Sequence, residues 1–430
     1  MKTQIVFRNA FFGITMLLFT WGGIQTALAA ETDTEPAQAY YGREICEIEV
    51  RGNARTLDPV VQRIAGLETG SDLDEKSLTQ ARINLEKSGL FAEVAIKAQP
   101  CPADSDAPVT LILEVEDKWT LIPVPFFSSD GSSVMGGLVA IESNLLGTGK
   151  QLISGVMGGT EGLSGFAVYA DPALFQSRYT LVLSAGGGVG DEEIATPDGE
   201  TALTFKTNSI SGSFGLGYRF TPRLSATVRT RFEEYDISNI KGPAAEGSLE
   251  IEDSQRQLSL ETRFDATVPY GSLLKGFETA ARASYSFVEN SPSISGQAAL
   301  NVPTLAAQRL RLLAAGGFGQ RPLLSEEPLS GRDGFRTLPF GKATAKDFWS
   351  TAVAYDLPVL TRDWGAVVIS SFYEQGWYRS AAAGEHNFYG PGAGFRVYLR
   401  KLAIPALGLD IAYNLESDRT VFSIAVGMQM

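Results

Sequence analysis

Two kinds of hydrophobic pattern follow one another along the chain. In the first, short alternating runs flank two stretches with helical spacing, and the dipeptide Ser88-Gly89 marks the end of the second stretch. This pattern predicts a small α+β domain with the element order β-α-α-β-β. The expected elements are a strand around Ile48 and Val50, helices over Leu57–Leu67 and Glu75–Ser88, and strands over Ala92–Ala98 and Val109–Val115.

The second pattern is an alternation of apolar and polar residues that continues from Trp119 to Met430. In one clean segment, apolar positions between Leu224 and Phe232 share a face, while Arg229 and Arg231 lie on the other. A soluble sandwich would bury the apolar face, whereas a membrane barrel turns it toward lipid and keeps the charged face in a wet lumen. We count sixteen such segments, although fourteen or eighteen fit nearly as well.

A secretory leader favours the membrane barrel over the sandwich. After a basic start, Ala10–Trp21 contains an apolar core and Ala27–Ala29 supplies a small-x-small cleavage site. We therefore expect residues 1–30 to be a signal peptide and residues 31–43 to be a flexible lead-in. A long and nearly cysteine-free β region after such a leader, with aromatic residues near the strand ends, is typical of an outer-membrane barrel.

Composition narrows the classes of function. With 36 basic and 49 acidic residues the net charge is −13, which argues against nucleic acid or anionic lipid as a general partner. A single histidine, His386, and two cysteines argue against a catalytic triad or a zinc site. The stretch Gly147–Lys150 lacks the spacing and the following helix of a phosphate loop. We therefore expect no enzyme, no cofactor and no metal.

The first region resembles a POTRA (polypeptide-transport-associated) domain over Glu44–Asp117. The resemblance implies a three-stranded sheet backed by two helices, placed in the periplasm and in contact with unfolded clients. A rigid spacer is the alternative role. The positions that carry the resemblance are Gly52-Asn53, Gly66, Gly70 and the run Ser88–Phe91.

The second region, residues 118–430, resembles the bacterial surface antigen barrel of the outer-membrane insertase superfamily (BamA/TamA-like). This resemblance implies an all-β transmembrane β-barrel of sixteen antiparallel strands, which agrees with the count of alternating segments. The motifs that carry it are Asn144–Leu152, Glu261–Ser272, the loop around Arg336, Ser371–Trp377, Gly390–Leu402 and the closing run Thr420–Met430.

The barrel resemblance gives a role to the polar insertion Ser330–Gly341. In the family, the loop after the eleventh strand folds into the lumen, where its arginine meets an acidic residue on the thirteenth strand. Here the arginine is Arg336 and the acid, by position, is Glu374, while Thr337 stands where the family has glycine. We refer to this predicted pair as the lumenal latch. An ordinary ion pair in a wet pore is the alternative.

The POTRA resemblance implies two local features. The strand that contains Val94 and Ile96 is the candidate client-binding edge, because an exposed edge strand accepts an extended peptide by β-augmentation. Cys46 and Cys101 both fall near the start of the third strand of such a sheet, so a disulfide in the oxidising periplasm is predicted. Two separate thiols remain the alternative.

The first barrel strand contains Pro123 and Pro125, which leave one side of the strand without two consecutive amide donors. If that side faces the last strand, the seam that closes the barrel is under-bonded; if it faces the second strand, the seam is not affected. In the family, such a seam is thought to open sideways and pass clients to the membrane. The last strand carries an outward apolar series that includes Phe422 and ends on Met430, where an assembly signal usually has an aromatic residue.

Taken together, these patterns predict an outer-membrane barrel with one periplasmic domain. It would bind unfolded outer-membrane or secreted client proteins and assist their insertion into, or passage across, the outer membrane. Outer-membrane lipid is a further partner, and periplasmic chaperones or accessory subunits are additional candidates. A dedicated secretion pore or channel for one partner protein or solute is the alternative function, and a structural barrel without transport activity is the third.

Overall fold

The computed structural model describes residues 40–101, 108–129, 134–159, 162–195, 201–246, 253–319, 323, 326–329, 332–338, 343–399 and 407–425. The predicted signal peptide, most of the predicted lead-in and Met430 lie outside these residues.

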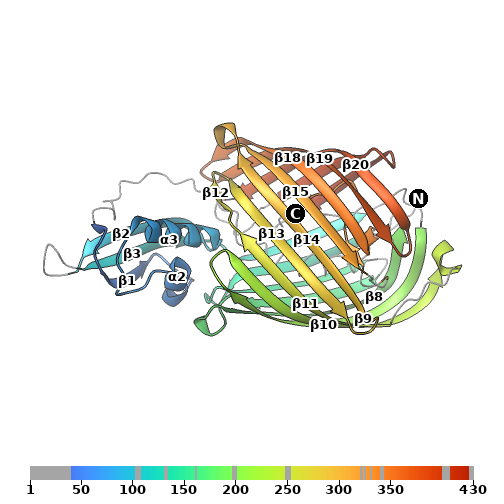
Figure 1. The fold of residues 1–430 in the computed structure, drawn as a ribbon, viewed down its shortest axis with the longest axis horizontal. Coiled ribbons are helices and arrows are strands. Elements are labelled where there is room, and N and C mark those ends of the chain that lie inside the picture. The colour runs from blue at the N-terminus through green and yellow to red at the C-terminus, as the bar shows by residue number, and fades with distance from the viewer. Residues whose placement is uncertain are drawn as a thin grey trace.

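A three-stranded sheet and two helices form the N-terminal domain (Figure 1). The central strand β3 is parallel to β1 and antiparallel to β2. The predicted order β-α-α-β-β is confirmed. The elements are β1 (Ile45–Arg51), α2 (Asp58–Ala65), α3 (Glu75–Lys87), β2 (Phe91–Pro100) and β3 (Val109–Asp117).

The helix ends follow from local chemistry. Helix α2 ends at Gly66, whose φ of 70° is a left-handed conformation that glycine adopts without a Cβ penalty. Helix α3 begins after Asp74, whose carboxylate accepts a hydrogen bond of 2.6 Å from the Ser77 N–H. Among the described residues, no helix is long and apolar enough to cross a membrane.

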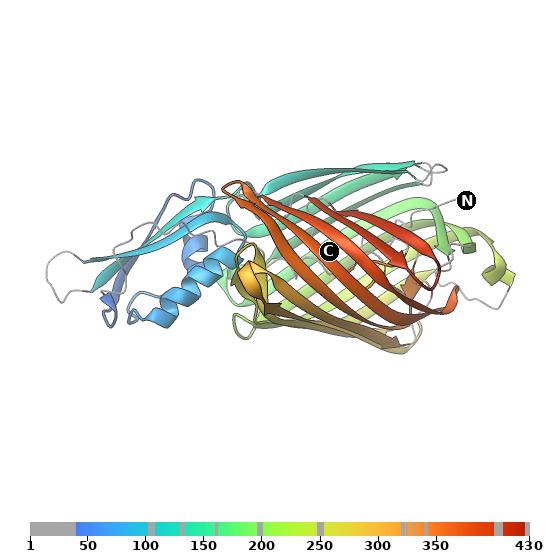
Figure 2. The ribbon, with the colours of Figure 1, turned by 90° about the horizontal axis from the view of Figure 1, so that it is seen from above.

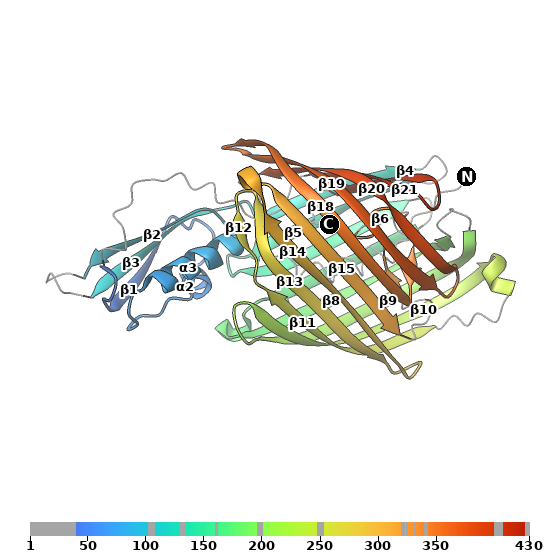
Figure 3. The same ribbon diagram turned by 45° about the horizontal axis from the view of Figure 1, so that its top comes forward.

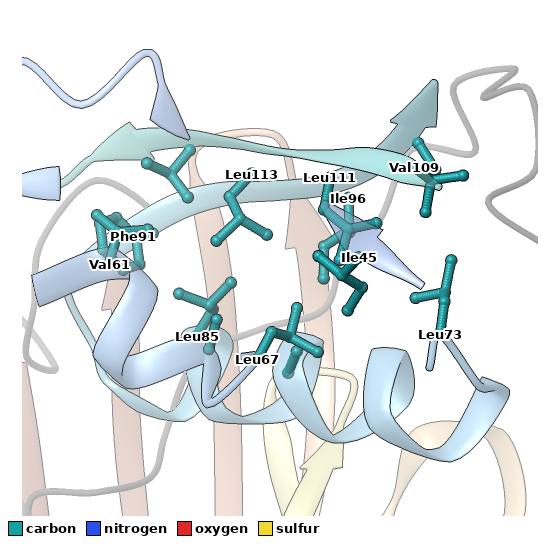
Figure 4. Packing of buried hydrophobic residues seen from close by; sticks show 14 of the residues in the cluster. Ile45, Val61, Leu67, Leu73, Leu85, Phe91, Ile96, Val109, Leu111 and Leu113 are labelled. Carbon is teal, nitrogen blue, oxygen red and sulfur yellow. The ribbon is translucent and has the colours of Figure 1, made fainter. Parts of the chain in front are cut away.

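The core of this domain lies between the sheet and the helices (Figure 4). Leu111 and Leu113 of β3 point toward Leu85 of α3, and all three side chains are fully buried. The alternation predicted for β3 therefore fills one continuous apolar layer. Other members of the cluster are Ile45, Val61, Leu67, Leu73, Phe91, Ile96 and Val109.

Within the described residues, sixteen strands close into a barrel, if β11 and β12 are counted as two segments of one strand because both pair with β13 (Figures 1 and 3). Each strand pairs with its neighbours in chain order, and β22 lies beside β4 to close the cylinder. The first eight strands are β4 (Leu121–Ser129), β5 (Val134–Leu145), β6 (Lys150–Gly159), β7 (Gly162–Asp171), β8 (Tyr179–Ala195), β9 (Thr201–Arg219), β10 (Leu224–Lys241) and β11 (Ser254–Asp265) with β12 (Val268–Tyr270).

The remaining eight strands complete the wall on the other side of the barrel. They are β13 (Leu273–Ser286), β14 (Ser291–Pro303), β15 (Arg309–Gly319), β18 (Asp347–Arg362), β19 (Gly365–Ser380), β20 (Gly384–Leu399), β21 (Leu407–Asn414) and β22 (Arg419–Ala425). A two-stranded ladder, β16 (Glu327–Pro328) with β17 (Thr344–Ala345), belongs to the insertion after β15, and short 3-10 turns occur at η2 (Leu174–Gln176), η3 (Pro243–Glu246) and η4 (Leu305–Ala307).

The two faces of the wall differ as the alternation predicts. On β10, the Val228 side chain is 50% exposed on the outer face, whereas the neighbouring Arg229 is 4% exposed. Arg229 and Arg282 both pair with Glu261 of β11, at 3.1 and 2.9 Å. An apolar outer face and a charged, ion-paired lumen are the features of a membrane barrel, so the predicted all-β transmembrane fold is confirmed.

The N-terminal domain lies against one end of the barrel (Figures 1 and 2). Strand β3 ends at Asp117 and β4 begins at Leu121, so only a short connection separates the two parts. We propose that the domain boundary lies here, as the ranges 44–117 and 118–430 predict.

Candidate functional site

The described part of the long insertion, residues 332–338, is packed into the lumen against β19. The Nε atom of Arg336 lies 3.4 Å from Oε2 of Glu374, and the Thr337 N–H donates to Oε1 of the same carboxylate at 2.6 Å. Arg336 is 5% exposed, and Glu374 and Thr337 are completely buried. The structure thus brings the two predicted latch residues together. This burial favours loop docking over the alternative of an ion pair in a wet pore.

A further acid, which the sequence analysis did not single out, extends the latch. Asp333 lies 3.4 Å from a guanidinium nitrogen of Arg336 and forms a second ion pair with Arg311 on β15. The middle of the insertion is therefore held from two strands: Arg311 of β15 binds Asp333, and Glu374 of β19 binds Arg336. The spacing of three residues between Asp333 and Arg336 was the only sequence signal for the contact between these two side chains.

Two glycines make room for aromatic side chains that support the loop. A Cβ on Gly392 of β20 would lie 2.2 Å from the Phe372 ring, and the Cζ of Arg336 lies 3.3 Å from the centre of that ring. A Cβ on Gly376 of β19 would lie 2.5 Å from the ring of Phe388. The loop residue Phe335 packs on Phe388 and on Phe348 of β18, with ring centres 5.6 and 5.8 Å apart.

This arrangement explains the glycine-rich motifs that first carried the barrel resemblance. Each glycine makes room for an aromatic ring that contacts the loop. Phe372 lies against the guanidinium of Arg336, as a cation–π contact, and Phe388 packs on Phe335 at an interplanar angle of 39°. The site binds and positions the chain's own loop. Among the described residues, no three metal-binding side chains are grouped so that they would hold a metal ion.

The hydrogen bonds of β4 decide which way its two prolines face. The Ser143 N–H donates to the Thr120 carbonyl at 3.1 Å, so Thr120 directs its backbone toward β5. In an antiparallel pair, opposite residues alternate between bonded and non-bonded sites, and the pairing of β4 with β5 has no irregularity. Even-numbered residues of β4 therefore bond to β5, while Pro123 and Pro125 face the other neighbour, β22.

The missing donors consequently lie at the seam between the first and last barrel strands. Figure 3 shows β4 near β21, on the side of the barrel where the first and last barrel strands meet. Phe422 of β22 is 70% exposed, as expected for the outward apolar series, whereas Met430 lies outside the described residues. The register between β4 and β22 also lies outside the described pairings.

The two edge strands of the N-terminal sheet differ in how far other parts of the domain bind their backbone groups. At the β1 edge, Ile45 exchanges backbone hydrogen bonds with Gly70 and Ser71, and Gln62 of α2 donates to the Ile48 carbonyl at 2.9 Å. The described hydrogen bonds thus cover β1 with other parts of the domain. Strand β2 is at the opposite edge of the sheet.

The backbone direction of β2 follows from the same alternation. Cys101, the residue that follows β2, donates its N–H to the Pro108 carbonyl at 2.7 Å, so the backbone groups of Cys101 face β3. Counting back along a regular ladder, Val94, Ile96 and Ala98 direct their N–H and C=O groups toward the outer edge. Their side chains pack into the core, where Ile96 is 6% exposed. The predicted client-binding residues therefore offer backbone groups, not side chains, to a partner.

Cys46 and Cys101 are joined in a disulfide. The bond links the start of β1 to the end of β2 across β3, whose Thr110 hydroxyl lies 3.5 Å from both sulfur atoms. It ties the two outer strands of the sheet together at the end away from the barrel.

The N-terminal domain contacts two turns of the barrel, which explains the motif at Asn144–Leu152. Asn144 donates to the Thr56 hydroxyl at 2.8 Å, and Gly147, with φ of 74°, accepts a backbone bond from Leu57 at 3.0 Å. A Cβ on Gly147 would lie 2.1 Å from the Arg55 carbonyl oxygen, so this contact requires glycine.

The second contact lies on α3. The Lys87 ammonium group is 3.1 Å from the Asp265 carboxylate and donates to the Thr267 carbonyl at 3.0 Å, at the break between β11 and β12. On α2, burial lowers the pKa of the Arg63 guanidinium, and the Asp171 carboxylate at the end of β7 opposes this shift. The two contacts fix the domain at separate points on the barrel rim.

No family model matches the chain, and no curated protein matches its sequence. Solved structures do match. BamA from Haemophilus ducreyi, in a structure lacking POTRA domains 1–3, is 13% identical with a TM-score of 0.52, over 90% of this chain and 84% of that chain. CdiB from Acinetobacter baumannii is 16% identical with a TM-score of 0.59, over 90% and 74%. CdiB from Escherichia coli is 10% identical with a TM-score of 0.57, over 97% and 96%.

Over the residues that the structure describes, the fold and the site together define a class: a sixteen-stranded transmembrane barrel with a loop docked in its lumen and an N-terminal β-α-α-β-β domain at its rim. BamA and CdiB share the barrel architecture with this chain. At identities of 10–16%, the likeness concerns the fold.

Proposed function

We propose that this protein is an outer-membrane assembly or translocation factor, which binds unfolded client proteins at β2 and assists their insertion into, or passage across, the outer membrane. The observation that carries the proposal is the direction of Pro123 and Pro125. Both face β22, so the strand that closes the barrel meets a partner lacking two consecutive donors. A seam that lacks these two bonds separates more readily than the same pair of strands would with both donors present.

The N-terminal domain supports the same proposal. Its β2 edge presents the backbone of Val94, Ile96 and Ala98, which suits an extended peptide of any sequence. Unfolded barrel proteins are rich in such segments. The contacts of Thr56, just before α2, and of Lys87 on α3 hold the domain against the barrel rim.

A second candidate function is a pore dedicated to one partner protein or solute. The ion-paired lumenal face, with pairs such as Arg229–Glu261, favours passage of a polar chain through the lumen. In this case the client would use the lumen and leave the seam closed.

Depletion of the protein tests both functions. We expect the levels of many outer-membrane barrel proteins to fall, measured by quantitative proteomics of the outer-membrane fraction. Loss of one exported partner with unchanged barrel proteins would favour the dedicated pore. Unchanged levels of both, together with normal export, would contradict a transport role.

A proline at position 98 tests the β2 edge. Ala98→Pro removes an outward N–H while leaving the bonds to β3 in place, since prolines are tolerated on the open side of edge strands. We expect photo-crosslinking of clients from Gln99 to fall about fivefold, because one hydrogen bond contributes about 1 kcal/mol.

The matched control is Ala98→Ser, which keeps the backbone N–H at the same position. It should crosslink clients as the unaltered protein does. Equal capture by Ala98→Pro, with the fold intact by circular dichroism, would show that clients do not bind this edge.

A further inference from the structure

The lumenal loop is held through the backbone of Thr337 as well as through Arg336. The Thr337 N–H donates to Glu374 of β19 at 2.6 Å, and its carbonyl accepts from Nδ2 of Asn414, at the end of β21, at 3.3 Å. All three residues are completely buried. The two polar groups of one loop residue are therefore bound by two different strands.

Between these strands, β20 contributes a glycine. Gly390 is opposite Glu374 in the ladder between β19 and β20. Extending the regular ladder between β20 and β21 by two residues places Gly390 opposite Asn414 as well. A Cβ on Gly390 would lie 1.8 Å from the Tyr413 carbonyl oxygen, so no side chain fits at this position. Glu374, Gly390 and Asn414 therefore form one row across β19, β20 and β21. The central residue has no side chain, and the residue on each side of it binds the loop.

Asn414 also fixes the turn that follows it. Its Oδ1 accepts from the N–H groups of Glu416 and Ser417, at 2.9 and 3.2 Å. This turn joins β21 to β22, the strand that closes the barrel against β4. One buried side chain thus uses its oxygen to shape the last hairpin and its nitrogen to bind the lumenal loop.

We propose that Asn414 couples the lumenal latch to the seam: while the loop is docked, Asn414 holds the hairpin of β21 and β22 in place, and release of the loop loosens this hairpin and the seam beside it. This inference rests on the proposed function, because it assigns a regulation to the same seam. Asn414 is a positioning residue, which acts through the hairpin and the loop. Thermodynamic linkage makes the coupling reciprocal, so a loosened hairpin also favours undocking of the loop.

Asn414→Asp separates the two roles of the side chain. Aspartate keeps an oxygen for the Glu416 and Ser417 amides but has no donor for the Thr337 carbonyl. In purified protein in detergent or nanodiscs, we expect the β22 amides to exchange with deuterium about tenfold faster, while the amides of β14 are unchanged. By reciprocity, trypsin should cleave after Arg336 faster than in the unaltered protein.

Two further variants make the test decisive. Asn301→Asp places the same change at a buried asparagine of β14 and should leave the exchange of β22 unchanged. In a Glu374→Ala background, where the loop is already released, Asn414→Asp should add nothing to the exchange of β22. Unaltered exchange in Asn414→Asp, or an equal increase in both backgrounds, would overturn the coupling.

These measurements use no client protein. A failure of the coupling therefore appears in hydrogen exchange, whereas a failure of the proposed function appears in the depletion experiment. Either result is obtained independently of the other.

Discussion

Replacing Glu374 by alanine is expected to release the lumenal loop and to destabilise the docked state by about 3 kcal/mol. This is the lower end of the usual cost of breaking a buried ion pair, because Arg336 keeps Asp333 as a second partner. The change removes the acceptor of Arg336 and of the Thr337 N–H at the same time. Limited trypsin digestion of the membrane-embedded protein measures the release as cleavage at Arg336. The urea midpoint of the mobility shift in unheated gels measures the stability.

Two variants separate the charge from the backbone contact. Glu374→Gln keeps an oxygen for the Thr337 N–H but removes the charge, so its effect should lie between those of alanine and glutamate. The double change Arg336→Glu with Glu374→Arg restores the ion pair but leaves the Thr337 N–H without its acceptor, so we expect partial recovery over either single change. No recovery at all would contradict the pairing.

Restoring the two amides at the seam is expected to close it more firmly. Pro123→Ala together with Pro125→Ala adds two donors that face β22, at about 0.5–1.5 kcal/mol each. If the seam opens during client transfer, a more stable seam slows this step. We therefore expect a higher urea midpoint and a slower insertion of clients into liposomes that contain the double variant.

The control for this experiment is Pro303→Ala, at the end of β14 and away from the seam. It makes the same kind of change in the freedom of the unfolded chain, at one residue in place of two, without adding a donor between β4 and β22. Faster or unchanged client insertion by the Pro123 and Pro125 double variant, with the midpoint raised, would show that opening of the seam does not limit the reaction.

Much of the fold could be predicted from the sequence, because the strand period of two residues and the helix period of 3.6 residues are both local patterns. A strand of a membrane barrel must turn one face to lipid, so residues such as Val228 and Arg229 alternate whatever their neighbours are. In the N-terminal domain, α3 begins and ends near the predicted residues because its capping signals lie within a few positions of its ends. The predicted ranges differ from the observed ones by a few residues at most, for example Leu57–Leu67 against Asp58–Ala65.

Less of the candidate site was accessible. Arg336 and Glu374 were paired by resemblance, but the roles of Asp333 and Asn414 depend on Arg311 and Thr337, which lie 22 and 77 positions away from them in the sequence. Neither the hydrophobic periodicity nor a turn motif in the sequence predicts such contacts. The direction of Pro123 and Pro125 could not be decided either, since it depends on one hydrogen bond between Thr120 and Ser143 that sets the phase of the whole strand.

The sequence by itself determined which residues face lipid, which face the lumen or the core, and the order in which the elements follow, because these properties repeat every two or 3.6 residues. Only the tertiary structure decided which side of each strand meets which neighbour and which strands the loop joins. The physical reason is that the backbone groups of a strand point sideways, at right angles to its side chains. Polarity along the chain therefore reports the two faces of the sheet, and only strand pairing reports its edges.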